Sequence, residues 1–180
     1  DMHEEEHHDE DEDHDEEEHE EGHDDHGGLI LANYLQEDAE LDGYELEIGR
    51  VFNLASGDLE VSFSRDVVNG SLSSGMNIPR MSPARNIYSV GYSVNDYLFD
   101  LSFKDVDSQT DTAEEESATS GYQMLDAKLV RTFDVNGNSL RVSVFANNLL
   151  DEVARNHTSF VKNEVPLPGR NVGVRLKLNF

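Results

Sequence analysis

Strict alternation of apolar and polar side chains marks residues 170–180, RNVGVRLKLNF. Successive side chains of a β-strand point to opposite faces of a sheet, so this pattern predicts a strand with one apolar and one polar face. The apolar positions are Val172, Val174, Leu176, Leu178 and Phe180. The positions between them are Asn171, Gly173, Arg175, Lys177 and Asn179.

The same period of two recurs back to Leu29, with little sign of helix. It predicts an all-β fold of seven strands, at about 29–54, 58–69, 86–95, 96–107, 121–134, 139–149 and 170–180. Short turns are expected at 55–57, 95–96 and 136–138, and long loops at about 70–85, 108–120 and 150–169. Short and long connections therefore alternate, as they do in transmembrane up-and-down β-barrels.

A short sequence pattern that occurs twice supports this assignment of strands and turns. Arg50-Val51-Phe52 precedes a short turn, and Arg131-Thr132-Phe133 precedes another short turn 81 residues later. Each Arg interrupts an apolar face. One interpretation is a membrane-interface belt, in which the Arg reaches lipid headgroups and the Phe joins an aromatic girdle. The alternative is a local bulge that turns the Arg to the other face.

The N-terminal segment has a different composition. Residues 1–26 hold 17 of the 39 acidic residues and 7 of the 8 histidines, without Lys or Arg. Such a segment cannot bury a core, so we expect residues 1–28 to be a disordered loop and residues 29–180 to be the folded body. The net charge of −26 argues against nucleic acid as a partner, because phosphate binding needs clustered basic residues.

Several functional classes lack their sequence signals. The chain has no cysteine, which excludes disulfides, thiol catalysis and zinc fingers of the Cys type. There is no run of about 18 apolar residues for a transmembrane helix. The scattered acids of the strands and the Ser73-Ser74-Gly75 stretch form no catalytic pattern, so we expect neither an enzyme nor an organic cofactor.

The histidines suggest a metal instead. Zn²⁺ prefers imidazole nitrogen and carboxylate oxygen, and a flexible chain can wrap two or three imidazoles around one ion. Cu²⁺ and Ni²⁺ suit the same donors. The candidate ligands are His3, His7, His8, His14, His19, His23 and His26, with His157 as a further candidate. For His157, which stands alone in a long loop, an ordinary polar role is the alternative.

Four short motifs resemble a known family. Asn147-Asn148-Leu149-Leu150-Asp151 is similar to the N-L-[LF]-[DN] motif of TonB-dependent receptors, and Pro168-Gly169-Arg170 is similar to their P-G-R motif. Ile78-Pro79-Arg80 with Pro83 resembles a family loop. The terminal Phe180 resembles the signal read by the barrel-assembly machinery. The resemblance covers about residues 29–180.

The resemblance implies more than the residues show. The family has a 22-stranded barrel in the outer membrane of Gram-negative cells, an N-terminal plug, and a TonB box that engages TonB with ExbB and ExbD. We therefore expect this chain to be the C-terminal part of such a receptor, surrounded by outer-membrane lipid. With Phe180 on the periplasmic side, the three long loops and residues 1–28 lie outside the cell.

Within the family, the His-rich loop and Ala154–Phe160 most resemble the zinc-uptake receptors. Two alternatives remain open at this point. One is a receptor of the same fold for a siderophore, metal chelate or other nutrient, in which the His-rich loop is accessory. The other is a soluble or surface zinc-buffering protein with a β domain, which would bury one sheet face in a core of its own.

The histidine segment gives the first prediction. Replacing its seven histidines with Asn keeps the acids and removes the imidazoles. Calorimetry on a peptide of residues 1–28 should show more than one zinc per peptide, lost on acidification below about pH 6 and absent from the Asn version. In the full-length receptor, the same change should lower zinc uptake at scarce zinc and alter it little at abundant zinc. Equal zinc binding by both peptides would remove the histidines from the mechanism.

Overall fold

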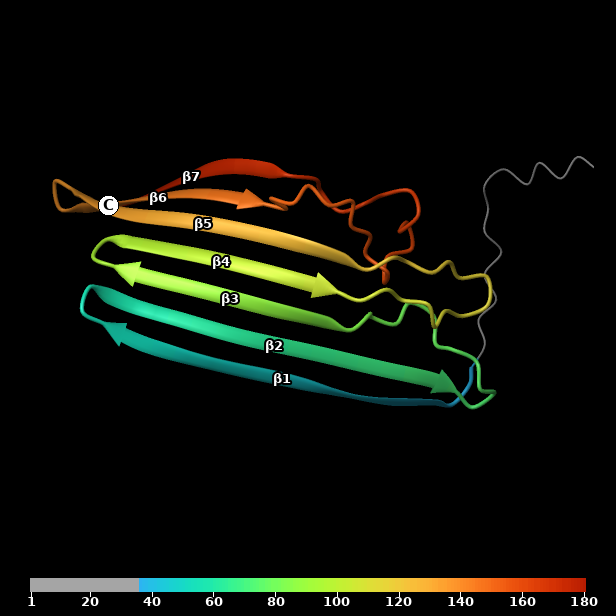
Figure 1. Cartoon of the computed structure of the whole chain (residues 1–180). Coiled ribbons are helices and arrows are strands. Elements are labelled where there is room, and N and C mark those ends of the chain that lie inside the picture. Colours follow the sequence, from blue (N-terminus) through green and yellow to red (C-terminus); the bar gives the residue numbers. More distant parts are fainter. Residues whose placement is uncertain (1–35) are drawn as a thin grey trace, which may run out of the picture. The chain divides into compact units, whose positions relative to one another are not determined.

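The computed structural model describes residues 36–180 of the chain, which form a single antiparallel sheet (Figure 1). Its seven strands are β1 (Ala39–Leu54), β2 (Gly57–Leu72), β3 (Arg85–Val94), β4 (Tyr97–Val106), β5 (Tyr122–Val135), β6 (Asn138–Asn147) and β7 (Asn171–Asn179). The predicted all-β fold is thus confirmed for this part of the chain. None of its elements is a helix long and apolar enough to cross a membrane.

The strands form a meander, because each pairs with its neighbours in sequence and the sheet order is β1-β2-β3-β4-β5-β6-β7. The connections segregate by length. Residues 55–56, 95–96 and 136–137 make short turns at one end of the sheet, which we call the turn end. Residues 73–84, 107–121 and 148–170 make long loops at the other end, the loop end (Figure 1). The predicted alternation of loop lengths is confirmed.

The first hairpin differs from its prediction at both boundaries. We expected a strand from about residue 29, but residues 36–38 are not in a strand and β1 begins at Ala39. Residues 29–35 lie outside the described part. On the other side of the hairpin β2 continues to Leu72, beyond the expected end at 69, and pairs there with Ala39. The partner strand therefore sets this boundary, which a single-strand pattern cannot show.

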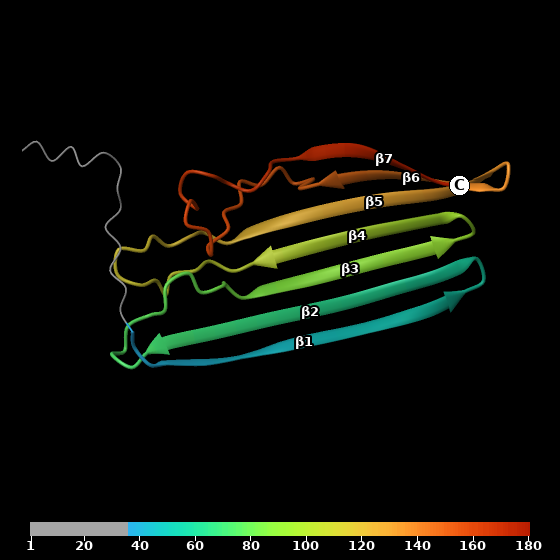
Figure 2. The same cartoon turned by 180° about the vertical axis from the view of Figure 1, so that it is seen from behind.

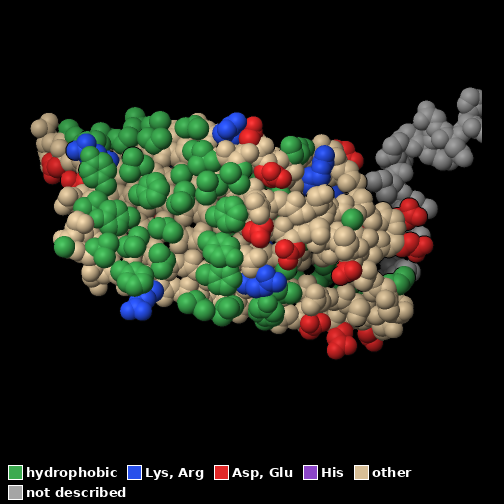
Figure 3. All heavy atoms as spheres, viewed as in Figure 1, with side chains coloured by type: hydrophobic (Ala, Val, Ile, Leu, Met, Phe, Trp, Pro, Cys, Tyr) green, Lys and Arg blue, Asp and Glu red, His purple; other side chains and the backbone are tan. Residues whose placement is uncertain are grey.

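The cross-strand register places every apolar series on the same face of the sheet. Leu59, for example, lies opposite Tyr92, which lies opposite Phe99, which in turn lies opposite Leu129. The row continues through Val144 to Val174. Figure 3 shows this apolar face, where hydrophobic side chains extend over all but the loop end. The opposite, polar face carries mainly serines, acids, lysines and arginines.

No second layer covers either face within residues 36–180 (Figure 1, Figure 2). The only buried apolar side chains of this part are Val106, Val130 and Ala154. By contrast, Leu176 is 67% exposed and Val174 64% exposed. The described sheet therefore has no hydrophobic core of its own, and its apolar face needs an apolar surrounding from elsewhere.

Aromatic side chains form a row across the middle strands of the apolar face, near the loop end. Phe63 lies opposite Tyr88, with ring centroids 5.0 Å apart, and Tyr88 lies opposite Phe103 at 6.2 Å. Such cross-strand aromatic pairs stabilise a sheet and fix its register. The next row toward the loops is polar and consists of Arg65, Asn86, Asp105 and Gln123.

Arg50 and Arg131, the arginines of the repeated pattern, lie on the apolar face near the turn end. Arg131 pairs with Tyr97 in an uninterrupted register, so no bulge turns it to the polar face. Its guanidinium lies 4.4 Å from the ring centre of Phe133, and that of Arg50 lies 4.9 Å from the ring centre of Phe52. The bulge interpretation is therefore wrong for both residues. The lipid contact of the belt interpretation stays a prediction.

The last strand pair contains a close approach that only glycine permits. Gly173 of β7 lies opposite Phe145 of β6, and the phenyl ring covers the glycine so closely that an added Cβ would overlap it. An aromatic ring over a cross-strand glycine shields a backbone that would otherwise pack against nothing.

Because of this contact, the effect of Gly173→Ala on the free energy of unfolding should change sign when Phe145 is removed. Gly173→Ala should lower the free energy of unfolding by about 1 kcal/mol, because the new methyl group overlaps the ring. In a Phe145→Ala background the same change should raise it by about 0.5–1 kcal/mol, since alanine restricts the unfolded chain. Urea unfolding of the full-length protein folded in lipid vesicles, followed by circular dichroism, measures both differences. Gly91→Ala, which meets only ordinary contacts, is the control and should be insensitive to Phe145.

Candidate functional site

The predicted metal ligands divide into two groups. His3, His7, His8, His14, His19, His23 and His26 all lie outside the described residues. His157 lies within them, in the long loop 148–170 that connects β6 to β7. Among residues 36–180, no three His, Cys, Asp or Glu side chains converge in a way that would hold a metal ion.

His157 is buried, with 1% of its surface exposed, and both ring nitrogens have partners. Nδ1 lies 2.9 Å from Oγ1 of Thr119, and Nε2 lies 3.1 Å from Oε1 of Glu116. A carboxylate can only accept, so Nε2 carries the proton and Nδ1 accepts from the threonine hydroxyl. As a metal ligand, His157 would have to exchange one of these partners for the ion.

Glu116 joins all three long loops. Besides His157, its carboxylate accepts a hydrogen bond of 2.8 Å from Nζ of Lys162. It also accepts bonds from the backbone N–H groups of Arg80, at 3.1 Å, and Ala113, at 3.2 Å. These donors come from loops 73–84, 107–121 and 148–170. We call Glu116, Thr119, His157 and Lys162 the loop cluster.

The loop cluster shifts the pKa of two of its members. Burial lowers the pKa of the His157 imidazole, and the nearby ammonium of Lys162 lowers it further, against the opposing effect of Glu116. For Glu116, burial alone would raise the pKa. The hydrogen bonds from Lys162, Arg80 and Ala113 outweigh burial and leave the pKa of that carboxyl below its usual value. Both shifts favour a neutral His157 and an ionised Glu116 at neutral pH.

The family-like motifs meet at the base of the same loop. Asn148 is 2% exposed, and its amide donates to the carbonyl of Pro168 at 3.2 Å and to that of Glu152 at 2.9 Å. Asp151 accepts from the backbone N–H of Arg170 at 3.0 Å and from its guanidinium at 3.1 Å. Hydrogen bonds between the two motifs thus join the two ends of the long loop 148–170.

The polar face forms an open trough across β2 to β6. Its lining includes Glu60, Ser62, Asp100, Ser102, Asp126 and Lys128. Lys128 forms an ion pair of 3.2 Å with Asp100, and both side chains are about half exposed, so the pair is water-accessible and contributes little stability. A wall of this kind can contact hydrated ions or polar ligands.

Sequence reasoning singled out His157 and the two motifs but missed Glu116, Thr119 and Lys162. No local signal distinguishes Glu116 from Glu114 and Glu115, which stand beside it in the same acidic run. Lys162, the partner that does distinguish it, lies 46 residues further along the chain.

Comparison with known proteins adds no assignment: no family model matches this chain, and no curated protein matches it either.

The buried imidazole predicts acid-sensitive loops. Because its pKa is lowered in the folded state, the folded loops bind fewer protons than the open ones. The stabilisation is complete above the ordinary value of 6.5 and is lost as pH falls below it. Opening of loops 107–121 and 148–170, measured by hydrogen exchange corrected for intrinsic rates, should increase between pH 7 and pH 5, by at most about tenfold per pH unit.

His157→Gln is the matched variant for this prediction, because it keeps a polar side chain and removes the titration. Its loop opening should be nearly independent of pH over the same interval. An equal acid response in both proteins would assign the effect to other groups.

Proposed function

We propose that residues 36–180 form seven consecutive strands in the barrel wall of a TonB-dependent outer-membrane receptor, whose cargo is zinc or a similar transition metal. One observation carries the membrane part of this proposal. All seven strands of a single meander place apolar side chains on the same face, and nothing in the described part covers that face. Monomeric soluble proteins rarely expose apolar patches larger than a few hundred Å².

The borders of the apolar face fit a bilayer. On β5, Gln123 belongs to the polar row near the loop end, and Arg131 stacks on aromatic rings near the turn end. Only apolar residues occupy this face of β5 between them: Leu125, Ala127 and Leu129. The stretch from Gln123 to Arg131 measures about 27 Å along the strand at the usual rise per residue. Outer-membrane barrels have an apolar band of about 25 Å between two aromatic girdles, and strand tilt shortens the projection somewhat.

The direction of the sheet is consistent with the family. The C-terminal end of β7 and the three short turns lie at the same end of the sheet (Figure 1). In outer-membrane barrels the short turns are on the periplasmic side. The three long loops, with the loop cluster, then lie on the extracellular side. The barrel-assembly machinery would read Phe180, and TonB with ExbB and ExbD would act through a plug outside these residues.

The metal part rests on the histidines of residues 1–26 and not on the strands. Seven imidazoles among 17 carboxylates suit the collection of Zn²⁺, Cu²⁺ or Ni²⁺. A receptor for a metal chelate would share every feature of the strands, so the zinc uptake of the variant without these histidines separates the two. A soluble zinc buffer fits less well, because residues 36–180 contain only three buried apolar side chains.

Neighbouring residues on β4 allow a direct test of the membrane location. Leu101 lies on the apolar face and Ser102 on the polar face, and the chain has no native cysteine. In the full-length protein reconstituted into vesicles, a bimane label on Leu101→Cys should be quenched by brominated lipid but not by aqueous iodide. A label on Ser102→Cys should show the opposite pattern. Protection of the Leu101→Cys label from both quenchers would indicate a soluble core and overturn the proposal.

A further inference from the structure

Arg131 occupies an unusual position for a charged residue. It lies on β5, which pairs with β4 on one side and β6 on the other, so its surroundings on the sheet are complete. On its own strand, Leu129 and Phe133 flank it on the apolar face, and across the strands Tyr97 and Val142 lie opposite. A guanidinium ion in such surroundings is costly unless an anion or water compensates its charge.

Aromatic rings hold this guanidinium in place. Its central carbon lies 4.8 Å from the ring centre of Tyr97 and 4.4 Å from that of Phe133. Within residues 36–180 the Arg131 side chain forms neither a hydrogen bond nor an ion pair, and it is exposed. The rings attract the cation but accept none of its strong N–H hydrogen bonds, so these donors have no acceptor among residues 36–180.

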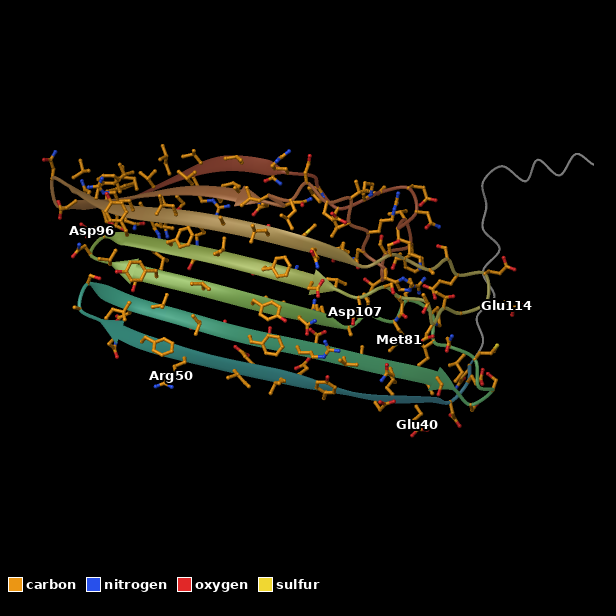
Figure 4. The ribbon with its side chains drawn as sticks, in the orientation of Figure 1. Glu40, Arg50, Met81, Asp96, Asp107 and Glu114 are labelled. Atoms are coloured by element: carbon orange, nitrogen blue, oxygen red, sulfur yellow. The ribbon has the colours of Figure 1, made fainter. Side chains whose placement is uncertain are left out.

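No carboxylate of the apolar face lies near enough to serve as that acceptor. The described strands carry three acidic residues on this face, Glu40, Asp42 and Asp105, and all three lie toward the loop end. Figure 4 labels Glu40 and Arg50 at opposite ends of β1. The carboxylates at the turn end, Asp58, Asp96 and Asp134, belong to the polar face or to a turn. Among residues 36–180, none of them forms an ion pair with Arg50 or Arg131.

Arg50 repeats the arrangement on β1. It precedes Phe52 as Arg131 precedes Phe133, and it lies over that ring at 4.9 Å. Beside it is a shallow hollow lined by apolar atoms of Ile48, Val61 and Phe63. Since β1 is an edge strand of the described sheet, Arg50 has a neighbouring strand on one side only, whereas Arg131 has one on each side.

We propose that Arg131, and likewise Arg50, binds the phosphate of a phospholipid headgroup in the leaflet on the turn side, with the acyl chains lying along the apolar face. Guanidinium matches two phosphate oxygens with two parallel N–H bonds, which an ammonium ion cannot do. Apolar side chains lie next to each guanidinium, so the occupant needs an anion joined to an apolar tail. This inference rests on the proposed membrane location.

The chain offers a matched control. Arg141 of β6 lies opposite Thr132, one residue along from Arg131, and is also exposed, but its side chain belongs to the polar face. Arg141→Gln therefore removes the same charge at the same height of the sheet without touching the apolar face.

Native mass spectrometry of the full-length protein in dodecyl maltoside, titrated with phosphatidylglycerol, tests the proposal. Arg131→Gln should weaken lipid retention about fivefold, and Arg50→Gln should do the same at a second site, while Arg141→Gln should have no effect. The unaltered protein should retain phosphatidylglycerol in preference to a galactolipid without phosphate. This second comparison needs no variant and holds even if a variant folds poorly.

Three results would overturn the proposal. Equal retention by Arg131→Gln and Arg141→Gln would show that Arg131 does not hold the lipid. Equal retention of the galactolipid would show that phosphate is not recognised. Displacement of the lipid by millimolar inorganic phosphate would assign the site to free phosphate. If brominated lipid quenches the label on Leu101→Cys and one of these three results is found, the membrane location stands and only the phosphate-binding role is removed. If brominated lipid does not quench that label, the membrane location itself is wrong.

Discussion

The pleat of the β-sheet is the constraint on which the rest of this structure depends. Because side chains alternate along each strand and the register keeps partners on one face, seven apolar series add up to one continuous surface. Hydrogen bonding between strands satisfies the backbone but buries almost no side chain. The sheet therefore obtains little hydrophobic stabilisation from itself, and the medium that covers its apolar face must supply it.

This constraint explains why the strands could be predicted from the sequence while some of their ends could not. A period of two is visible in each strand separately, and turn residues such as Asn136 and Gly137 adopt the positive φ angles that tight hairpins require. The beginning of β1 is different. It is fixed by pairing between Ala39 and Leu72, residues far apart in sequence, and no pattern within residues 29–54 contains that information.

The loops show the same limit more strongly. The Asn-Asn-Leu-Leu-Asp and Pro-Gly-Arg motifs were recognisable, and their mutual hydrogen bonds give a physical reason for them to occur together: Asn148 and Asp151 fasten the far end of the loop at Pro168 and Arg170. The role of Glu116 was not recognisable, because three successive glutamates look alike until the chain folds. Burial beside Lys162 and His157 selects one of them, and that choice is made by tertiary contacts alone.

The two ends of the apolar face differ in charge, and this difference bears on how such a sheet would settle in a bilayer. At the loop end Arg65 bonds to Tyr44 and Asn86, and Asp105 accepts from Gln123, so polar groups there satisfy one another. At the turn end, Arg50 and Arg131 lie over aromatic rings and form no hydrogen bond or ion pair with another side chain of residues 36–180. Polar groups that satisfy one another resist burial in hydrocarbon but need no further partner. The two guanidinium ions at the turn end still need an acceptor. In the proposed location, the turn end would fix the depth of the sheet and the loop end would limit it.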